Sequence, residues 1–124
     1  MRIFLTTEEK KAILSVAIMM QVSDGDAALE ESFATVAEAL RMGLDPVASF
    51  EDCSNPNSFE PAIKCVSKMS FEKKKYVFSV LYKVMVSDGK VDPRESRFLN
   101  IISEEAGLPN MSPSEIDVFL YSVE

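Results

Sequence analysis

The sequence contains no histidine, and it has only two cysteines and four glycines. Without histidine, neither a Ser-His-Asp triad nor a catalytic Cys-His pair can form, and a Cys/His zinc site has too few ligands. The two cysteines, Cys53 and Cys65, are too far apart for a CxxC motif, and we expect them to be reduced thiols. The few glycines do not form a phosphate-binding loop. The common nucleophilic and nucleotide-binding motifs are therefore excluded.

Long hydrophobic runs are also absent. The two longest, residues 12–22 and 76–86, span 11 residues each, about half of what a helix needs to cross a bilayer. Met1 to Leu5 lead directly into Thr6-Thr7-Glu8-Glu9, so no secretory signal peptide is expected. The net charge of −7 argues against nucleic acid as a partner and favours basic proteins or cations. We therefore expect a soluble cytoplasmic protein without direct membrane insertion.

The sequence does contain an internal repeat. Sliding the chain along itself by 64 positions, without a gap, brings identical residues into register along much of its length. Ten of these pairs are Lys11/Lys75, Ser15/Ser79, Val16/Val80, Val22/Val86, Ser23/Ser87, Asp24/Asp88, Gly25/Gly89, Glu31/Glu95, Gly43/Gly107 and Leu44/Leu108. The pattern predicts a duplicated unit. Its repeats would cover about residues 6–51 and 70–124, with a linker at residues 52–57.

Capping motifs and hydrophobic spacing predict about seven helices and no sheet. Thr6 with Glu9 forms a capping box at the start of the first helix, and Ser112 with Glu115 forms another at the start of the last. The helices are expected at about residues 6–22, 28–42, 45–51, 59–67, 71–86, 93–106 and 112–123. Residues 76–82 are rich in strand formers, but the length of the segment and its counterpart in the first repeat favour a helix. The predicted fold is an all-α bundle forming a single domain, residues 1–124.

The helices at residues 6–22 and 71–86 are apolar on nearly every side, which is typical of buried helices. We expect these two to pack against each other at the centre and the others to wrap around them. In the helix at residues 93–106, Phe98, Ile101, Ile102 and Glu105 or Ala106 fall at the spacing of one helical face. The run Lys73-Lys74-Lys75 is interpreted as a solvated helix start, and Phe71 is assigned to the core.

Acidic residues follow both central helices, in the matching segments of the two repeats. The six candidate metal ligands are Asp24, Asp26 and Glu31 in the first repeat, and Asp88, Asp92 and Glu95 in the second. A helix C-terminus already carries partial negative charge, so carboxylates are favoured there only if they are solvated or meet a cation. Oxygen ligands without histidine or cysteine select a hard ion, Ca²⁺ or Mg²⁺.

A structural role explains the same residues. Asp92 before Pro93, with Glu95 following, fits a helix N-cap with a capping-box-like start, and Asp88-Gly89 fits a helix-closing turn. The segments do not match an EF-hand, because Asp24-Gly25-Asp26 places glycine second instead of sixth. Helix capping and metal binding both remain open at this point.

The repeated apolar helix, the Ser-Asp-Gly that follows it and the acidic helix start resemble the tellurite-resistance protein TerB. Residues 87–95, Ser-Asp-Gly-Lys-Val-Asp-Pro-Arg-Glu, are closest to the family pattern. The same fold occurs in the N-terminal domain of the membrane-anchored DnaJ-like protein DjlA, and the resemblance covers residue 10 to the end. It implies a seven-helix bacterial cytoplasmic domain, with the acidic loops as a metal or partner site in stress-linked complexes near the membrane. Ala28 stands where Asp92 would fall in the first repeat, with Asp26 as its substitute.

These observations lead to one functional expectation with two alternatives. The leading one is a non-enzymatic, TerB-like interaction domain that binds a partner protein, with a divalent cation at the acidic Asp-Gly loops. The second is a dedicated metal-binding or metal-stress protein similar to those of tellurite resistance. The third is a small enzyme that uses the carboxylates on a metal-bound substrate.

Overall fold

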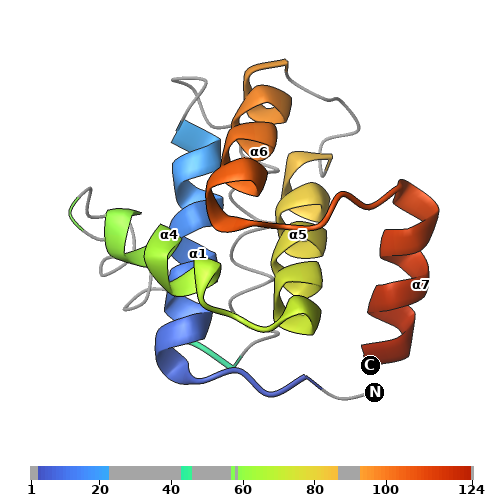
Figure 1. Ribbon diagram of the computed structural model, residues 1–124, viewed down its shortest axis with the longest axis horizontal. Helices are drawn as coiled ribbons and strands as arrows, with labels where there is room; N and C mark the ends of the chain where they lie inside the picture. The colour runs from blue at the N-terminus through green and yellow to red at the C-terminus, as the bar shows by residue number, and fades with distance from the viewer. Residues whose placement is uncertain (1–2, 23–42, 46–56, 58, 87–92, 124) are drawn as a thin grey trace.

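The structure, a computed structural model, describes residues 3–22, 43–45, 57, 59–86 and 93–123 (Figure 1). Within these ranges the chain forms five helices and no strand. They are α1 (Thr7–Val22), α4 (Phe59–Ser67), α5 (Phe71–Met85), α6 (Pro93–Ala106) and α7 (Pro113–Val123). The predicted all-α class is therefore confirmed.

The seven predicted helices and the internal duplication are not established by these five elements. The helix expected at residues 28–42, and nearly all of the one at 45–51, lie outside the described residues. The five others agree with prediction to within one residue at each end. The strand-forming residues 76–82 lie inside α5, so the length of the segment outweighs its β-propensity.

Side-chain caps fix where the helices begin. The amide of Thr6 donates to Glu9 Oε1 at 2.9 Å, and the amide of Glu9 donates to Thr6 Oγ1 at 3.1 Å, which is the predicted capping box. Ser112 and Glu115 form the same reciprocal pair at the start of α7, at 3.2 and 3.3 Å. At the other end of α6, Gly107 has a φ of +71°, the left-handed conformation that glycine adopts most easily.

The core is built around α1 and α5. Ile13 and Met20 of α1, and Val77, Leu81 and Val84 of α5, are fully buried in one hydrophobic cluster. The helix α1 packs most extensively against α4 and also contacts α5 and α6, while α5 contacts all four other described helices. The two apolar helices therefore pack against each other, as the sequence predicts.

The buried face of α6 agrees with the predicted one in part, since Ile102 and Ala106 are buried. Ile101 is exposed and Phe98 is only partly buried, whereas Glu95, Leu99 and Ile102 are buried. Apolar residues occupy two adjacent faces of this helix, so the helical period alone does not select between them. Packing selects the face that begins at Glu95.

The direction of the helices sets what lies at each end of the bundle. The N-terminal ends of α1 and α5 are joined by an ion pair between Glu9 and Lys73, and both helices run in the same direction (Figure 1). The C-terminal ends of α1 and α5 and the start of α6 consequently lie at the same, upper end in Figure 1. The last helix, α7, lies at the edge of the bundle against α5. None of the described helices is long and apolar enough to cross a membrane.

Candidate functional site

Only one of the six predicted metal ligands lies within the described residues. Asp24, Asp26, Glu31, Asp88 and Asp92 all fall outside them. Among the described residues, no group of three or more acidic or cysteine side chains is placed to hold a metal ion. The metal-ligand prediction for those five residues therefore stays a prediction.

The sixth candidate, Glu95, lies in the first turn of α6 and is only 1% exposed. Its side chain is on the same face as Leu99 and Ile102, which is the core face of the helix. The positive end of the helix dipole favours a carboxylate at this position. This placement agrees with the helix-start role that the sequence also allows for Glu95.

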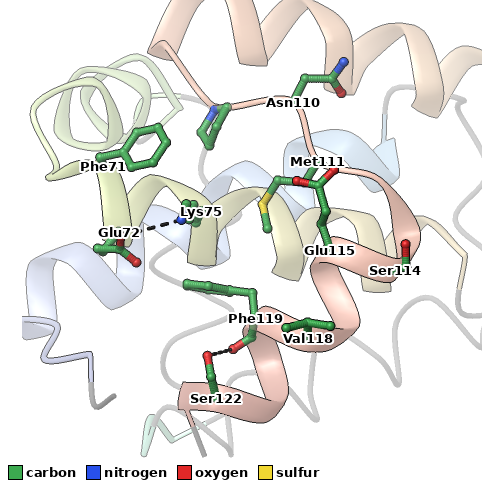
Figure 2. A pocket seen from close by; sticks show the side chains of 11 residues that line it. Phe71, Glu72, Lys75, Asn110, Met111, Ser114, Glu115, Val118, Phe119 and Ser122 are labelled. Carbon is green, nitrogen blue, oxygen red and sulfur yellow. Dashed lines mark hydrogen bonds and ion pairs between the residues drawn. The ribbon is translucent and has the colours of Figure 1, made fainter.

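An open groove of about 640 Å³ lies between α5 and α7 (Figure 2). It is lined by the first turn of α5, by the segment that connects α6 to α7, and by one face of α7. Its apolar lining consists of Phe71, Pro109, Met111, Val118 and Phe119. More apolar side chains line this groove than line the hollow beside Thr6 and Cys65.

Local interactions hold both walls of the groove in place. Ser70 caps α5 by accepting a hydrogen bond from the Lys73 amide, and the capping box of Ser112 and Glu115 fixes the first turn of α7. Ser79 Oγ, inside the core, lies 3.9 Å from Met111 Sδ. The groove is therefore a built part of the fold, since caps and core contacts determine its shape.

A lysine lies inside the groove instead of extending into solvent. Lys75 Nζ is 4.9 Å from the ring centre of Phe71 and 5.8 Å from that of Phe119, within the range of cation–π attraction. It is also 3.6 Å from Glu72 Oε1 (Figure 2). The positive charge is thus shared with two rings and a carboxylate. The interpretation of Lys73-Lys74-Lys75 as a solvated helix start is wrong for Lys75, which is only partly exposed.

Large apolar side chains remain exposed at the groove and elsewhere on α7. Phe71 is 60% exposed, Val118 69% and Tyr121 86%. The assignment of Phe71 to the core is therefore wrong, because its side chain lines the open groove and is not covered by another helix of the described structure. The exposure of Val118 and Tyr121 could have been predicted from the sequence. Val118 and Tyr121 are three residues apart on α7, where they form a second apolar stripe beside the buried Ile116 and Phe119.

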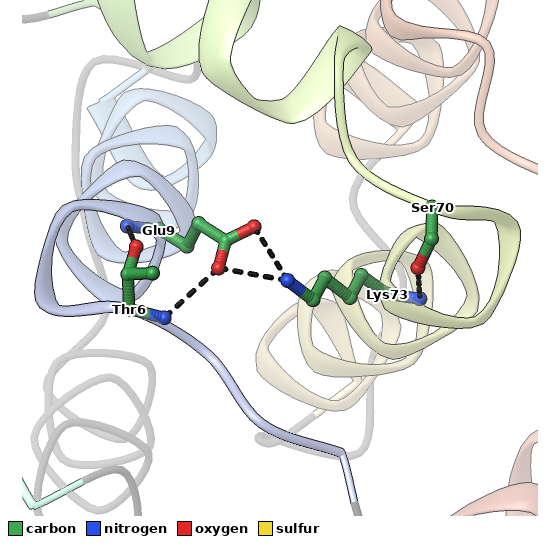
Figure 3. A network of polar contacts seen from close by, with 4 residues as sticks. All are labelled: Thr6, Glu9, Ser70 and Lys73. Carbon is green, nitrogen blue, oxygen red and sulfur yellow. Dashed lines mark hydrogen bonds and ion pairs between the residues drawn. The ribbon is translucent and has the colours of Figure 1, made fainter.

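A second polar cluster joins the starts of α1 and α5 (Figure 3). Lys73 Nζ lies 3.0 Å from both carboxylate oxygens of Glu9, and both side chains are mostly buried. Burial by itself raises the pKa of Glu9, but the hydrogen bond from the Thr6 amide and the ion pair with Lys73 outweigh it and lower the pKa overall. Lys73, like Lys75, is therefore not a solvated side chain.

The described cysteine lacks the features of a nucleophile. Cys65 is a partly buried free thiol beside a shallow hollow of about 460 Å³, which Glu8 and Glu9 also line. Burial and these two carboxylates raise the pKa of the Cys65 thiol, so little thiolate forms near neutral pH. The predicted reduced state of the two cysteines stays a prediction, and Cys53 lies outside the described residues.

Comparison with known proteins finds similar solved structures. No family model matches the chain, and no curated protein matches it. Among solved structures, the chain is similar to a protein of unknown function from Porphyromonas gingivalis W83, with a TM-score of 0.78 and 27% sequence identity. The match covers 98% of this chain and 94% of the other. The likeness extends over the whole fold, and the relative's description names no activity.

Proposed function

We propose that this chain is a non-enzymatic helical module that binds a partner protein through the groove between α5 and α7. The observation that carries the proposal is the exposed apolar surface at the groove. Phe71 and Val118, which line a hollow of about 640 Å³, are both more than half exposed, and Tyr121 is exposed three residues further along α7 from Val118. A cluster of exposed apolar side chains at a concave surface is typical of a protein-interaction site.

The chemistry of the described polar groups favours binding over catalysis. The charge of Lys75 is shared with Glu72 and two aromatic rings, and the raised pKa of Cys65 disfavours a thiolate nucleophile. An enzyme usually needs a pKa shifted toward its working pH and a pair of groups in hydrogen-bond reach. The groove offers shape and apolar contact, which are what a binding surface needs.

Site-specific photo-crosslinking in the native cell tests this proposal. A photoreactive phenylalanine analogue at Tyr121 should capture a defined partner, and the additional change Val118→Asp should abolish the capture. The matched control carries the analogue at Ile101, which is exposed on α6 away from the groove. Equal capture from both positions, or capture that survives Val118→Asp, would remove the groove from the function.

A second candidate function is divalent cation binding at the upper end of the bundle. It is favoured by the shared position of the C-terminal ends of α1 and α5 and the start of α6 (Figure 1). The acidic segments with Asp24, Asp26 and Glu31 and with Asp88, Asp92 and Glu95 adjoin these three helix ends. Segments that carry several carboxylates contain the oxygen ligands that Ca²⁺ and Mg²⁺ prefer.

Calorimetric titration with Ca²⁺ and with Mg²⁺ tests the cation proposal on the wild-type chain and on Asp88→Asn. Heat of binding in the wild type that is reduced in the variant supports it. If neither ion gives heat of binding, the cation proposal is wrong and helix capping is the role that stays for the acidic residues. The first proposal does not depend on this result, because the groove lies at a different place on the surface.

We also propose that the chain is a TerB-like domain that arose by duplication, as the sequence resemblance implies. Gly43 and Gly107, which are 64 positions apart, both have positive φ angles, +80° and +71°. Ser15 and Ser79, another such pair, are both buried. The family resemblance further suggests a cytoplasmic location and a partner within a membrane-associated complex. A crystal structure of the whole chain tests the duplication, which requires residues 6–51 to superimpose on the second repeat.

A further inference from the structure

We infer that the groove between α5 and α7 accepts a basic amphipathic segment of the partner, with one large apolar side chain flanked by lysine or arginine. This inference rests on the proposed function and specifies the chemistry of the partner. It follows from the arrangement of apolar and charged side chains in the groove.

The apolar part of the groove fits a single anchoring side chain. Met111 and Phe119 line its centre, and Phe71 and Val118 lie at its two sides (Figure 2). Burying an aliphatic or aromatic side chain among such residues favours binding, because apolar surface is removed from water. Methionine adapts to different shapes, so the central position tolerates more than one anchor.

Acidic side chains stand at opposite ends of this apolar strip. Glu72 lies toward the α5 end of the groove and Glu115 toward the start of α7 (Figure 2). Both are accessible to solvent. Glu115 accepts a hydrogen bond from the Ser112 amide, yet an ionised carboxylate has capacity for further donors. A partner with a cation on each side of its anchor therefore matches the groove.

The cation within the groove does not reverse this preference. Lys75 is drawn toward Phe71, Phe119 and Glu72, so its charge is directed at the walls of the groove. The net charge of −7 extends the negative potential beyond the groove. An acidic segment would meet this potential and the two terminal carboxylates. A second copy of the chain would do the same, since its own surface is acidic.

Selection from a displayed library of random peptides tests the inference without assuming a partner. Peptides enriched on the wild-type chain should carry lysine or arginine on both sides of an aromatic or aliphatic residue. Fluorescence anisotropy with the enriched consensus peptide then measures the affinity. The double variant Glu72→Gln with Glu115→Gln should weaken binding by about 2- to 30-fold, because two exposed ion pairs are lost. Glutamine at position 115 retains the capping box.

Three controls define the results that overturn the inference. Glu60→Gln, on α4 outside the groove, should leave the affinity unchanged. If the enriched peptides are acidic or uncharged but Val118→Asp abolishes their binding, the basic partner is wrong while the proposed function stands. If no enriched peptide is sensitive to Val118→Asp, both fail. Self-association in sedimentation that Val118→Asp removes would identify a second copy as the occupant and also overturn the inference.

Discussion

The helix α5 has two junctions that differ in kind. Toward α1, its start is closed by the mostly buried ion pair of Lys73 with Glu9, and its middle enters the central core through Leu81. Toward α7, the start of α5 borders an open groove in which Phe71 is exposed. Further along, the exposed side chains of Lys83 and Asp117 form an ion pair between the two helices. The same helix is thus sealed on one side and left open on the other.

This difference separates stability from recognition. A sealed junction maximises buried apolar area and pairs its charges, which is what folding requires. An open junction retains apolar area that folding does not use, and such area is available to a partner. Substitutions on the two sides of α5 should therefore affect different properties. Those toward α1 should lower stability, and those toward α7 should weaken binding.

The largest expected effect is at the sealed junction. Leu81→Ala should lower the free energy of unfolding by about 2–5 kcal/mol, because it creates a cavity in the core. Val118→Ala, at the open junction, should change it by less than about 0.5 kcal/mol. Urea denaturation of both variants measures the difference. Similar losses for the two would show that the open side is as important to folding as the sealed side.

Removing the ion pair at the sealed junction should have the next largest effect. Glu9→Gln should cost roughly 1–3 kcal/mol at neutral pH, because a mostly buried, charge-assisted interaction with Lys73 is lost while glutamine preserves the capping box. The folded-state pKa of Glu9 lies below its ordinary value of 4.5, so this stabilisation is present above that pH. It is lost as the pH falls through the folded-state pKa.

A matched surface pair provides the control for this prediction. Glu60 and Lys64 lie 3.5 Å apart on α4 and are both exposed, so Glu60→Gln should cost less than about 0.5 kcal/mol. Unfolding measured between pH 7 and pH 3 should show a smaller acid-dependent loss for Glu9→Gln than for the wild type. An unchanged pH profile would mean that Glu9 does not contribute to acid sensitivity.

A smaller effect is expected where the chain leaves α6 for the open side. Gly107→Ala should cost about 1–2 kcal/mol, because a side chain at φ +71° is strained. Gly43→Ala is its matched control, with φ +80° and open space around a new Cβ, whereas at Gly107 the Cβ would lie 3.2 Å from Lys74 Nζ. Equal costs in thermal unfolding would assign the whole effect to the backbone, and a larger cost at Gly107 would assign the excess to Lys74.

The smallest effect is expected at the exposed pair between α5 and α7. Lys83 Nζ lies 3.0 Å from Asp117 Oδ1, but both side chains are solvent-accessible. Asp117→Asn should therefore cost about 0.2–1 kcal/mol, and high salt should abolish the difference from the wild type. A loss as large as that of Glu9→Gln would contradict the contrast between the two junctions. Denaturation at low and high salt measures it.

Local rules predicted the helices well. The capping boxes of Thr6 and Ser112 and the closing Gly107 lie within a few residues of the positions they control, so the sequence contains the required information. The helical form of residues 76–82 was also predictable, because a segment of that length rarely forms a strand. The buried face of α6 was predicted only in part: Ile102 is buried but Ile101 is exposed, because the rotation of the helix depends on packing partners from other helices.

The candidate site was less predictable for the same reason. The groove combines residues 71–75 with residues 109–122, and their juxtaposition depends on how α7 packs against α5. Lys75 is an example. The lysines next to it in the sequence predict a solvated side chain, but its charge lies near the ring of Phe119, which is more than forty residues away. The acidic segments were more prominent in the sequence, and five of their six candidates lie outside the described residues.

The position of α7 at the edge of the bundle has a consequence for hydrogen exchange. A helix that packs mainly against one neighbour can detach by local opening, at a lower free energy than unfolding of the whole chain. Its amide protons should therefore exchange with deuterium earlier than those of α1. A molecule bound between α5 and α7 would add a second contact surface and slow that exchange, so the amides of α7 would report occupancy directly.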